Sequence, residues 1–252
     1  MTREMTCHCG AVLSGADTES LVEPALAHFE KAHAELGLSR VSVRNYLEAE
    51  DRTTGDLDRR DEVGEIEIVP LTPDRADEAI RFFDLDAFPD NPAWGSCYCM
   101  FYFLGGNENP EWGHLPWREI KDAQHARIEA GATTGALAHV DGRVAGWCNA
   151  SARSSFPTHA TGDDEGVRSV VCFVIAPPYR RHRLATKLLE AVIEDSPSSG
   201  YTTLEAYPRR DARSAASAYV GALEMYARAG FVITSDDPLV VRLDLSRIRH
   251  PV

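Results

Sequence analysis

The segment from Val170 to Leu189 joins a short apolar run to an amphipathic run through a basic turn. Residues 170–176 are apolar, rich in β-branched side chains and too short to cross a membrane, so they predict a buried strand. Pro177 and Pro178 end that strand, because proline has no N–H to donate to a sheet. Leucines then recur at helical spacing from Leu184. The free N–H groups and dipole of a helix start, beside arginines, suit a phosphorylated ligand. A basic helix start without a ligand is the alternative.

The turn resembles the acetyl-CoA signature of the GNAT superfamily of N-acetyltransferases, through the pattern Pro-x-Tyr-Arg-x-x-x-Leu-Ala that begins at Pro177. In that family a Gln/Arg-x-x-Gly-x-Gly/Ala loop wraps the CoA pyrophosphate. Arg183 stands where the family usually has glycine, and its guanidinium can offer donors of its own. The resemblance implies that the residues in contact with acetyl-CoA are Phe173, Val174, Ile175, Arg180, Arg181, His182, Arg183, Leu184, Ala185 and Thr186.

Composition limits the classes of function. A net charge of −13 argues against binding to nucleic acid or to an anionic membrane, and is compatible with a cationic acceptor such as an amine. The chain contains no apolar run of membrane-spanning length, and its start lacks the apolar core of a signal peptide, so we expect a cytoplasmic protein. The 6 cysteines include two Cys-x-Cys pairs, which is not the pattern of a disulfide framework and favours a reducing compartment.

The length of 252 residues exceeds that of a usual single domain. We expect a small α+β unit over residues 1–52, a polar linker over 53–64 and a larger unit over 65–252. For the larger unit, the resemblance implies an α/β (α+β) GNAT-like fold with a mixed, mostly antiparallel central sheet flanked by helices.

The small unit carries the candidate metal ligands Cys7, Cys9, His28 and His33. Zinc takes four thiolate or imidazole ligands in a tetrahedron, and a Cys pair on a turn facing a His pair on a helix supplies them. Buried thiols beside solvent-facing histidines are the alternative. The segment also resembles a family of small proteins catalogued as predicted metal-binding, with the same Cys-His-Cys-Gly start. A structural zinc ion would stabilise a unit with so small a core.

Several elements of the larger unit follow from local pattern. Residues 65–71 alternate and predict a first strand, and the Asp141-Gly142 pair between apolar runs predicts a hairpin. Alternation over residues 97–103, in an aromatic-rich loop, predicts a strand with Cys97 and Cys99 on one face. A helix is expected over about 117–130, and a last helix from about Ser217 to Ala229. The polar residues 151–166 form a loop near the acceptor, without assigned roles.

That last helix resembles the GNAT ending Leu-Tyr-x-x-x-Gly-Phe, which implies that Tyr226 lies opposite the thioester. Tyr226 is the candidate general acid for the CoA thiolate, and a buried structural tyrosine is the alternative. Glu205, on the strand after the CoA helix, is the candidate general base. A structural Glu205, with an amine that arrives neutral, is the alternative. Backbone N–H groups around Val174 and Ile175 are expected to polarise the acetyl carbonyl.

These features predict an acetyl-CoA-dependent N-acetyltransferase that acts on a primary amine of a small cationic acceptor, by direct attack in a ternary complex. The alternative is a non-catalytic GNAT-like protein that senses acyl-CoA or metal. The expected partners are a small-molecule amine, with no nucleic acid and no membrane, and a homodimer is left open.

Overall fold

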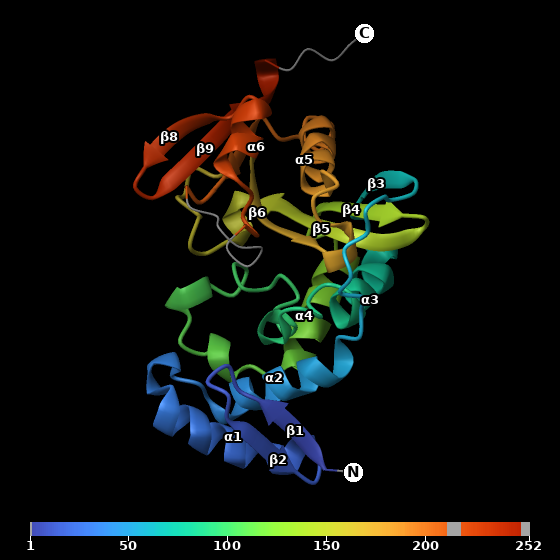
Figure 1. Ribbon diagram of the computed structural model, residues 1–252. Helices are drawn as coiled ribbons and strands as arrows, with labels where there is room; N and C mark the ends of the chain where they lie inside the picture. The colour runs from blue at the N-terminus through green and yellow to red at the C-terminus, as the bar shows by residue number, and fades with distance from the viewer. Residues whose placement is uncertain (1, 211–217, 248–252) are drawn as a thin grey trace.

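The computed structural model describes residues 2–210 and 218–247. Figure 1 shows its elements in chain order. The α-helices are α1 (Thr18–Ala32), α2 (Arg40–Arg52), α3 (Ala76–Leu85), α4 (Trp117–Glu129), α5 (Leu184–Asp195) and α6 (Leu223–Arg228). The strands are β1 (Arg3–Thr6), β2 (Val12–Gly15), β3 (Ile66–Pro70), β4 (Gly135–Val140), β5 (Arg143–Ala152), β6 (Val167–Ile175), β7 (Thr203–Ala206), β8 (Val232–Asp236) and β9 (Leu239–Asp244).

The N-terminal part is an antiparallel hairpin of β1 and β2 packed on helices α1 and α2. Asp17 and Ser20 form a reciprocal cap at the start of α1, and Ser39 caps α2. Such caps satisfy backbone N–H groups that a helix start leaves free. This part has a small core of its own, formed by the buried residues Met5, Leu21, Val22, Ala25, Val43 and Leu47.

The larger part is built on a seven-stranded sheet in the order β3-β4-β5-β6-β7-β9-β8. All neighbouring strands are antiparallel except β6 and β7, which are parallel. Helix α5 covers one face of the sheet, and α3 with α4 lies on the other (Figure 1). The fold is thus the mixed, mostly antiparallel sheet with flanking helices that the sequence predicted.

The parallel pair β6 and β7 separates halfway along β6. Strand β7 pairs only with Val167 to Val170, whereas β6 continues to Ile175. A register shift between Ala150↔Val170 and Asn149↔Cys172 leaves Val171 as an extra residue, which is a β-bulge. Beyond Val170, the edge of β6 that faces away from β5 therefore has no strand partner among the described residues.

Two predicted elements differ from the structure. Residues 97–103 form a series of turns, because Tyr98 and Cys99 have φ values of 44° and 55°, which a strand does not allow. Helix α6 begins only at Leu223, because Gly221 has φ 82° and interrupts the helical path before it. Ser217, the expected start, lies outside the described residues.

Helix α2 docks on the segment between α3 and α4. The Asn45 side chain donates to the Leu115 carbonyl at 2.8 Å and accepts from the Trp117 N–H at 3.1 Å. Ser39 and Ser42 donate to the Gly113 carbonyl, each at 2.6 Å.

The C-terminal end of α2 makes a further contact with the same segment. The Arg52 guanidinium lies 3.9 Å from the centre of the Trp117 ring and donates to the Gly95 carbonyl at 2.8 Å. Side chains of α2 thus hold backbone groups of residues 95–117 in place.

Residues 53–64, predicted as a linker, contain no helix or strand but contact the sheet unit at several points. The Gly55 N–H donates to the Leu85 carbonyl, and the Arg60 N–H donates to the Pro178 carbonyl. Arg60 also lies over the Tyr179 ring. The segment is therefore irregular, but these contacts hold it against the larger part.

Candidate acetyl-transfer site

The turn between β6 and α5 adopts a backbone shape that glycine usually supplies. Arg181 has φ 68° and Arg183 has φ 62°, both in the left-handed region. Arg183 directly precedes α5, and no side chain caps the helix there, so its first N–H groups can receive a ligand. The arginine at the usual glycine position thus keeps the left-handed backbone, at a cost of about 1 kcal/mol.

The arginines of this turn have different surroundings. The Arg180 Nε donates to the Ile175 carbonyl at 3.0 Å, and its guanidinium pairs with both carboxylate oxygens of Asp90. Arg181 and Arg183 are exposed, so their charge is available to a phosphate. Arg180 therefore shapes the turn, whereas Arg181 and Arg183 face solvent.

The remaining predicted CoA residues line the same strand, turn and helix start. His182 Nε2 lies 2.8 Å from the Arg60 carbonyl oxygen, which ties the turn to residues 53–64. Leu184 is buried in the main core, and Ala185 and Thr186 are half-buried at the start of α5. On β6, Phe173 and Val174 are buried and Ile175 is half-buried.

The free edge of β6 is covered by a turn at residues 218–221. The Phe173 N–H donates to the Tyr219 carbonyl at 2.6 Å. The next carbonyl, that of Val220, accepts a hydrogen bond from the Tyr226 hydroxyl at 2.8 Å. Tyr226 is fully buried, and burial raises the pKa of its phenol well above the usual value, so the proton stays on the oxygen. A backbone N–H of β6 and the Tyr226 phenol therefore donate to two consecutive carbonyls.

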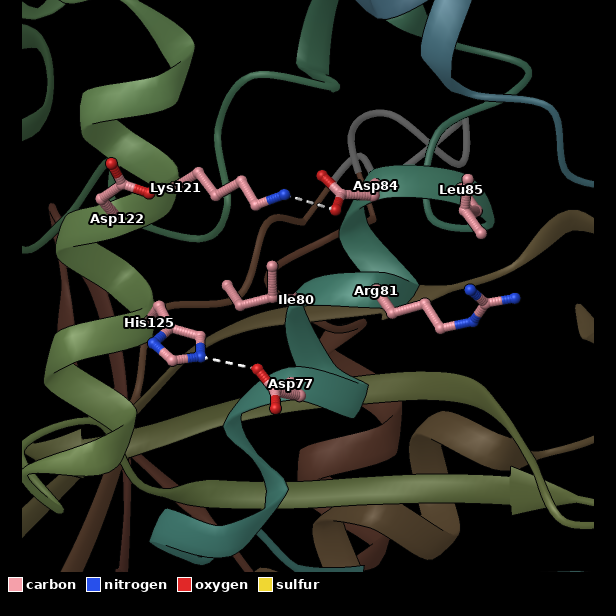
Figure 2. A pocket seen from close by; sticks show the side chains of 8 residues that line it. All are labelled: Asp77, Ile80, Arg81, Asp84, Leu85, Lys121, Asp122 and His125. Carbon is pink, nitrogen blue, oxygen red and sulfur yellow. Dashed lines mark hydrogen bonds and ion pairs between the residues drawn. The ribbon is translucent and has the colours of Figure 1, made fainter.

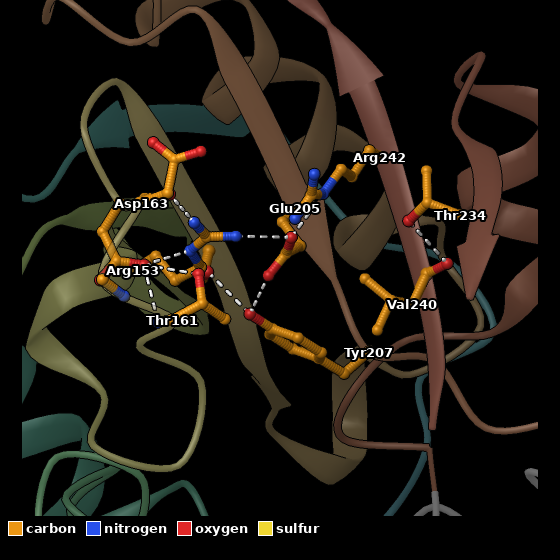
Figure 3. A network of polar contacts seen from close by, with 11 residues as sticks. Arg153, Thr161, Asp163, Glu205, Tyr207, Thr234, Val240 and Arg242 are labelled. Carbon is orange, nitrogen blue, oxygen red and sulfur yellow. Dashed lines mark hydrogen bonds and ion pairs between the residues drawn. The ribbon is translucent and has the colours of Figure 1, made fainter. Parts of the chain in front are cut away.

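Glu205 is buried in a closed polar network on β7 (Figure 3). Its Oε2 accepts from Arg153 Nη1 at 3.1 Å and from Arg242 Nε at 2.6 Å, and its Oε1 accepts from the Tyr207 hydroxyl. Arg153 also pairs with Asp164 at 2.5 Å. Because both carboxylate oxygens already accept hydrogen bonds, these contacts favour a structural role for Glu205 over the role of general base.

Aromatic rings gather beside this network and the free edge of β6. The His159 ring stacks on Tyr207, with centroids 3.7 Å apart, and lies 5.1 Å from the Tyr102 ring. The Tyr102 and Tyr219 hydroxyls are 3.0 Å apart, and Trp94 meets the Tyr219 ring edge-on. The sequence showed the aromatic density of residues 88–103, but not the partners that come from residues 159, 207 and 219.

A second cluster of functional side chains lies in the N-terminal part. Cys7 Sγ lies 3.4 Å from His33 Nε2, and Cys9 Sγ lies 3.4 Å from His28 Nε2. One ligand atom from each of the four residues lies within 4.8 Å of the others. Neighbouring ligands of a tetrahedral zinc ion are about 3.5 Å apart, so the spacing fits that metal. The Glu35 carboxylate lies 3.9 Å from His33 Nδ1, which is beyond hydrogen-bond distance.

A separate pocket of about 510 Å³ lies between α3 and α4 (Figure 2). Ion pairs bridge it, from Lys121 to Asp84 at 2.7 Å and from His125 to Asp77 at 2.9 Å. Its lining comes from these two helices only, so it shares no residue with the turn before α5 or the edge of β6.

The mixed sheet thus has one parallel pair, β6 and β7, which separates beside a basic turn and the start of α5. The sequence matches the model of the Acetyltransferase (GNAT) family over residues 97–231, more than half of the chain, and the chain belongs to this family. It is an acetyl-CoA-dependent acetyltransferase. None of the helices in its described parts has the length and hydrophobicity of a membrane span.

Solved structures show remote similarity. An N-acetyltransferase from Staphylococcus aureus Mu50 is 13% identical, with a TM-score of 0.45, over 72% of this chain and 99% of that one. The yncA protein of Salmonella typhimurium, solved with acetyl-CoA, is 14% identical, with a TM-score of 0.45, over 74% and 98%. The PaiA N-acetyltransferase of Thermoplasma acidophilum, solved with coenzyme A, is 13% identical, with a TM-score of 0.43, over 72% and 99%. A search of curated sequences finds no match.

Proposed function

We propose that this protein transfers an acetyl group from acetyl-CoA to a primary amine of a small cationic acceptor, by direct attack in a ternary complex. The observation that carries the proposal is the convergence of the Phe173 N–H and the Tyr226 hydroxyl on consecutive carbonyls. The Tyr219 carbonyl stands in for the acetyl carbonyl, and the Val220 carbonyl stands in for the sulfur.

In the proposed mechanism, acetyl-CoA displaces these carbonyls and takes over both donors. The Phe173 N–H polarises the acetyl carbonyl and stabilises the negative charge that develops on its oxygen. The Tyr226 phenol gives its proton to the departing CoA sulfur. Arg181, Arg183 and the open N-terminus of α5 hold the CoA phosphates.

The acceptor side supports a cationic amine. Trp94, Tyr102, Tyr207 and Tyr219 present aromatic rings close to the edge of β6, and such rings attract ammonium groups. The net charge of −13 raises the local concentration of cations around the protein.

Acetylation of an amine panel tests the proposal. We expect release of free CoA thiol, and an acetylated product by mass spectrometry, with spermidine, tyramine or lysine methyl ester, and little with glutamate. Bound acetyl-CoA without thiol release on any amine would instead indicate a protein that only binds acyl-CoA.

Replacing Tyr226 with Phe should lower kcat for thiol release about 100-fold, because the phenol proton is lost while the ring remains. Binding of acetyl-CoA, measured by calorimetry, should change little. Tyr46→Phe is the matched control, since that hydroxyl contacts Glu50 in the N-terminal part. An unchanged rate in Tyr226→Phe removes Tyr226 from the acid role.

Two substitutions at Arg183 separate the effect of its charge on acetyl-CoA binding from the effect of its left-handed backbone on stability. Arg183→Ala keeps the unfavourable left-handed residue and loses the guanidinium, so we expect acetyl-CoA to bind about 10-fold more weakly. Arg183→Gly also loses the charge but relieves about 1 kcal/mol of backbone strain, so its thermal stability should exceed that of Arg183→Ala. Equal acetyl-CoA affinity in wild type and both variants would exclude a phosphate contact by Arg183.

We also propose that Cys7, Cys9, His28 and His33 hold one structural zinc ion. The donor set and the 3.4 Å sulfur–nitrogen distances support this metal. Zinc would join the β1–β2 turn, which carries both cysteines, to the C-terminal end of α1, which carries His28 and is followed directly by His33. All four protein ligands are supplied, which leaves no open position for catalysis.

A further inference from the structure

The proposed reaction lacks a proton acceptor for the attacking amine. An amine that bonds to the acetyl carbon must lose a proton, and Glu205 has both oxygens engaged by Arg153, Arg242 and Tyr207. A base for this step therefore needs a buried lone pair that is free, next to the aromatic rings and the edge of β6. Residues 153–166, between β5 and β6, contain such a group.

His159 Nε2 is such an atom. It is inaccessible to solvent and has no hydrogen-bond partner in the described structure. The ring donates instead to the Thr158 backbone, which leaves Nε2 as the unprotonated nitrogen. A buried nitrogen without a hydrogen-bond partner is unfavourable unless a ligand donates a hydrogen bond to it. The amine N–H of an acceptor could be this donor.

The surroundings keep the ring neutral at neutral pH, and some of its neighbours offset part of the cost of charging it. Burial lowers the pKa of His159 to about 4, so the imidazole is unprotonated at neutral pH. The Tyr207 and Tyr102 rings at 3.7 Å and 5.1 Å can stabilise an imidazolium by cation–π attraction. The Glu205 carboxylate favours the charged form as well. The other charged groups near this region are Arg153, Asp163 and Asp164 on the same loop, Arg242 on β9, and Arg209 over the Tyr219 ring.

We propose that His159 is the general base of the acetyl transfer, with Nε2 accepting the proton of the attacking amine. The inference rests on the proposed function. In this step the amine nitrogen bonds to the acetyl carbon and the carbon–sulfur bond breaks. The amine proton passes to His159 Nε2, and the Tyr226 proton passes to the CoA sulfur. Solvent then takes the proton from His159 and restores the one on Tyr226, so the products are the N-acetylated amine and free CoA thiol.

The test uses His159→Ala and His159→Gln in the full chain, with spermidine and tyramine as acceptors. We expect kcat to fall about 100-fold in both variants, with acetyl-CoA affinity within 2-fold of wild type. Added imidazole and substituted imidazoles should restore activity to His159→Ala, and the rescued rate should rise with the pKa of the added base. A ring that is only structural would give rescue that depends on size and not on basicity. His125→Ala, in the separate pocket between α3 and α4, is the control with unchanged activity.

The possible failures are distinct. If the wild type turns over and both His159→Ala and His159→Gln keep the wild-type rate, the general-base role is overturned and the proposed function stands. Rescue without dependence on basicity does the same. No wild-type turnover on any amine overturns the proposed function and the base together. If His159→Ala does not fold, as judged by circular dichroism, a wild-type rate in His159→Gln decides against the base.

Discussion

A Cys7→Ser variant is expected to lose the proposed zinc ion and the ordered structure of residues 3–52. The core of this part contains few buried side chains, so the proposed metal would add substantially to its stability. Structural zinc contributes about 10 kcal/mol or more to folding in small zinc-binding domains. Removal of one thiolate should therefore remove a large stabilising contribution to this part.

Elemental analysis measures the metal, with one zinc per chain in wild type and none in Cys7→Ser. Circular dichroism should show a loss of helix corresponding to α1 and α2. Cys97→Ser is the control, because Cys97 lies in the turns before α4. This variant should retain the metal. Native wild-type protein without metal, or zinc retained by Cys7→Ser, would refute the site.

An Arg153→Met variant is expected to be less stable by about 3 kcal/mol, because it removes one partner of a buried ion pair and leaves Glu205 in the interior. The Arg153 and Glu205 side chains are 3% and 4% exposed, so water cannot replace the lost guanidinium. Methionine keeps most of the volume, which limits any contribution from a cavity.

Urea unfolding followed by circular dichroism gives the free energy of unfolding. Arg242→Met provides the comparison, since Arg242 contacts the same Glu205 oxygen but its side chain is 43% exposed. That variant should lose only about 1 kcal/mol, because solvent partly replaces the exposed partner. Equal losses in the two variants would contradict the view that burial of Arg153 sets the effect.

The elements that the sequence predicted correctly have strong local signals. The prolines at 177 and 178 mark the end of β6, and Asp141-Gly142 marks the β4–β5 hairpin. Where the local sequence pattern predicted the wrong element, the reason is a residue with a positive φ angle. Tyr98 and Cys99 alternate with their neighbours as strand residues do, yet their positive φ values turn the chain. Gly221 similarly delays α6 until Leu223.

The candidate site was predictable only where its residues are neighbours in the sequence. The turn at 180–186 could be located because its residues are consecutive. The Cys/His cluster could be suggested from spacing along a turn and a helix. The group of His159, Tyr102, Tyr207 and Tyr219 could not, because its members meet only when β6, β7 and three connecting segments pack together. Likewise, nothing local shows that two arginines engage Glu205.

The docking of α2 has a consequence for how the protein can be divided. Asn45, Ser39 and Ser42 supply the hydrogen-bond partners of the Leu115 and Gly113 carbonyls and of the Trp117 N–H. A graft that replaced residues 1–52 with a foreign domain would strip these backbone groups of their partners, even if the remaining sheet were left untouched. The two parts are thus joined by the contacts of α2 as well as by the chain through residues 53–64. We therefore expect that residues 1–52 cannot be exchanged without destabilising the segment between α3 and α4.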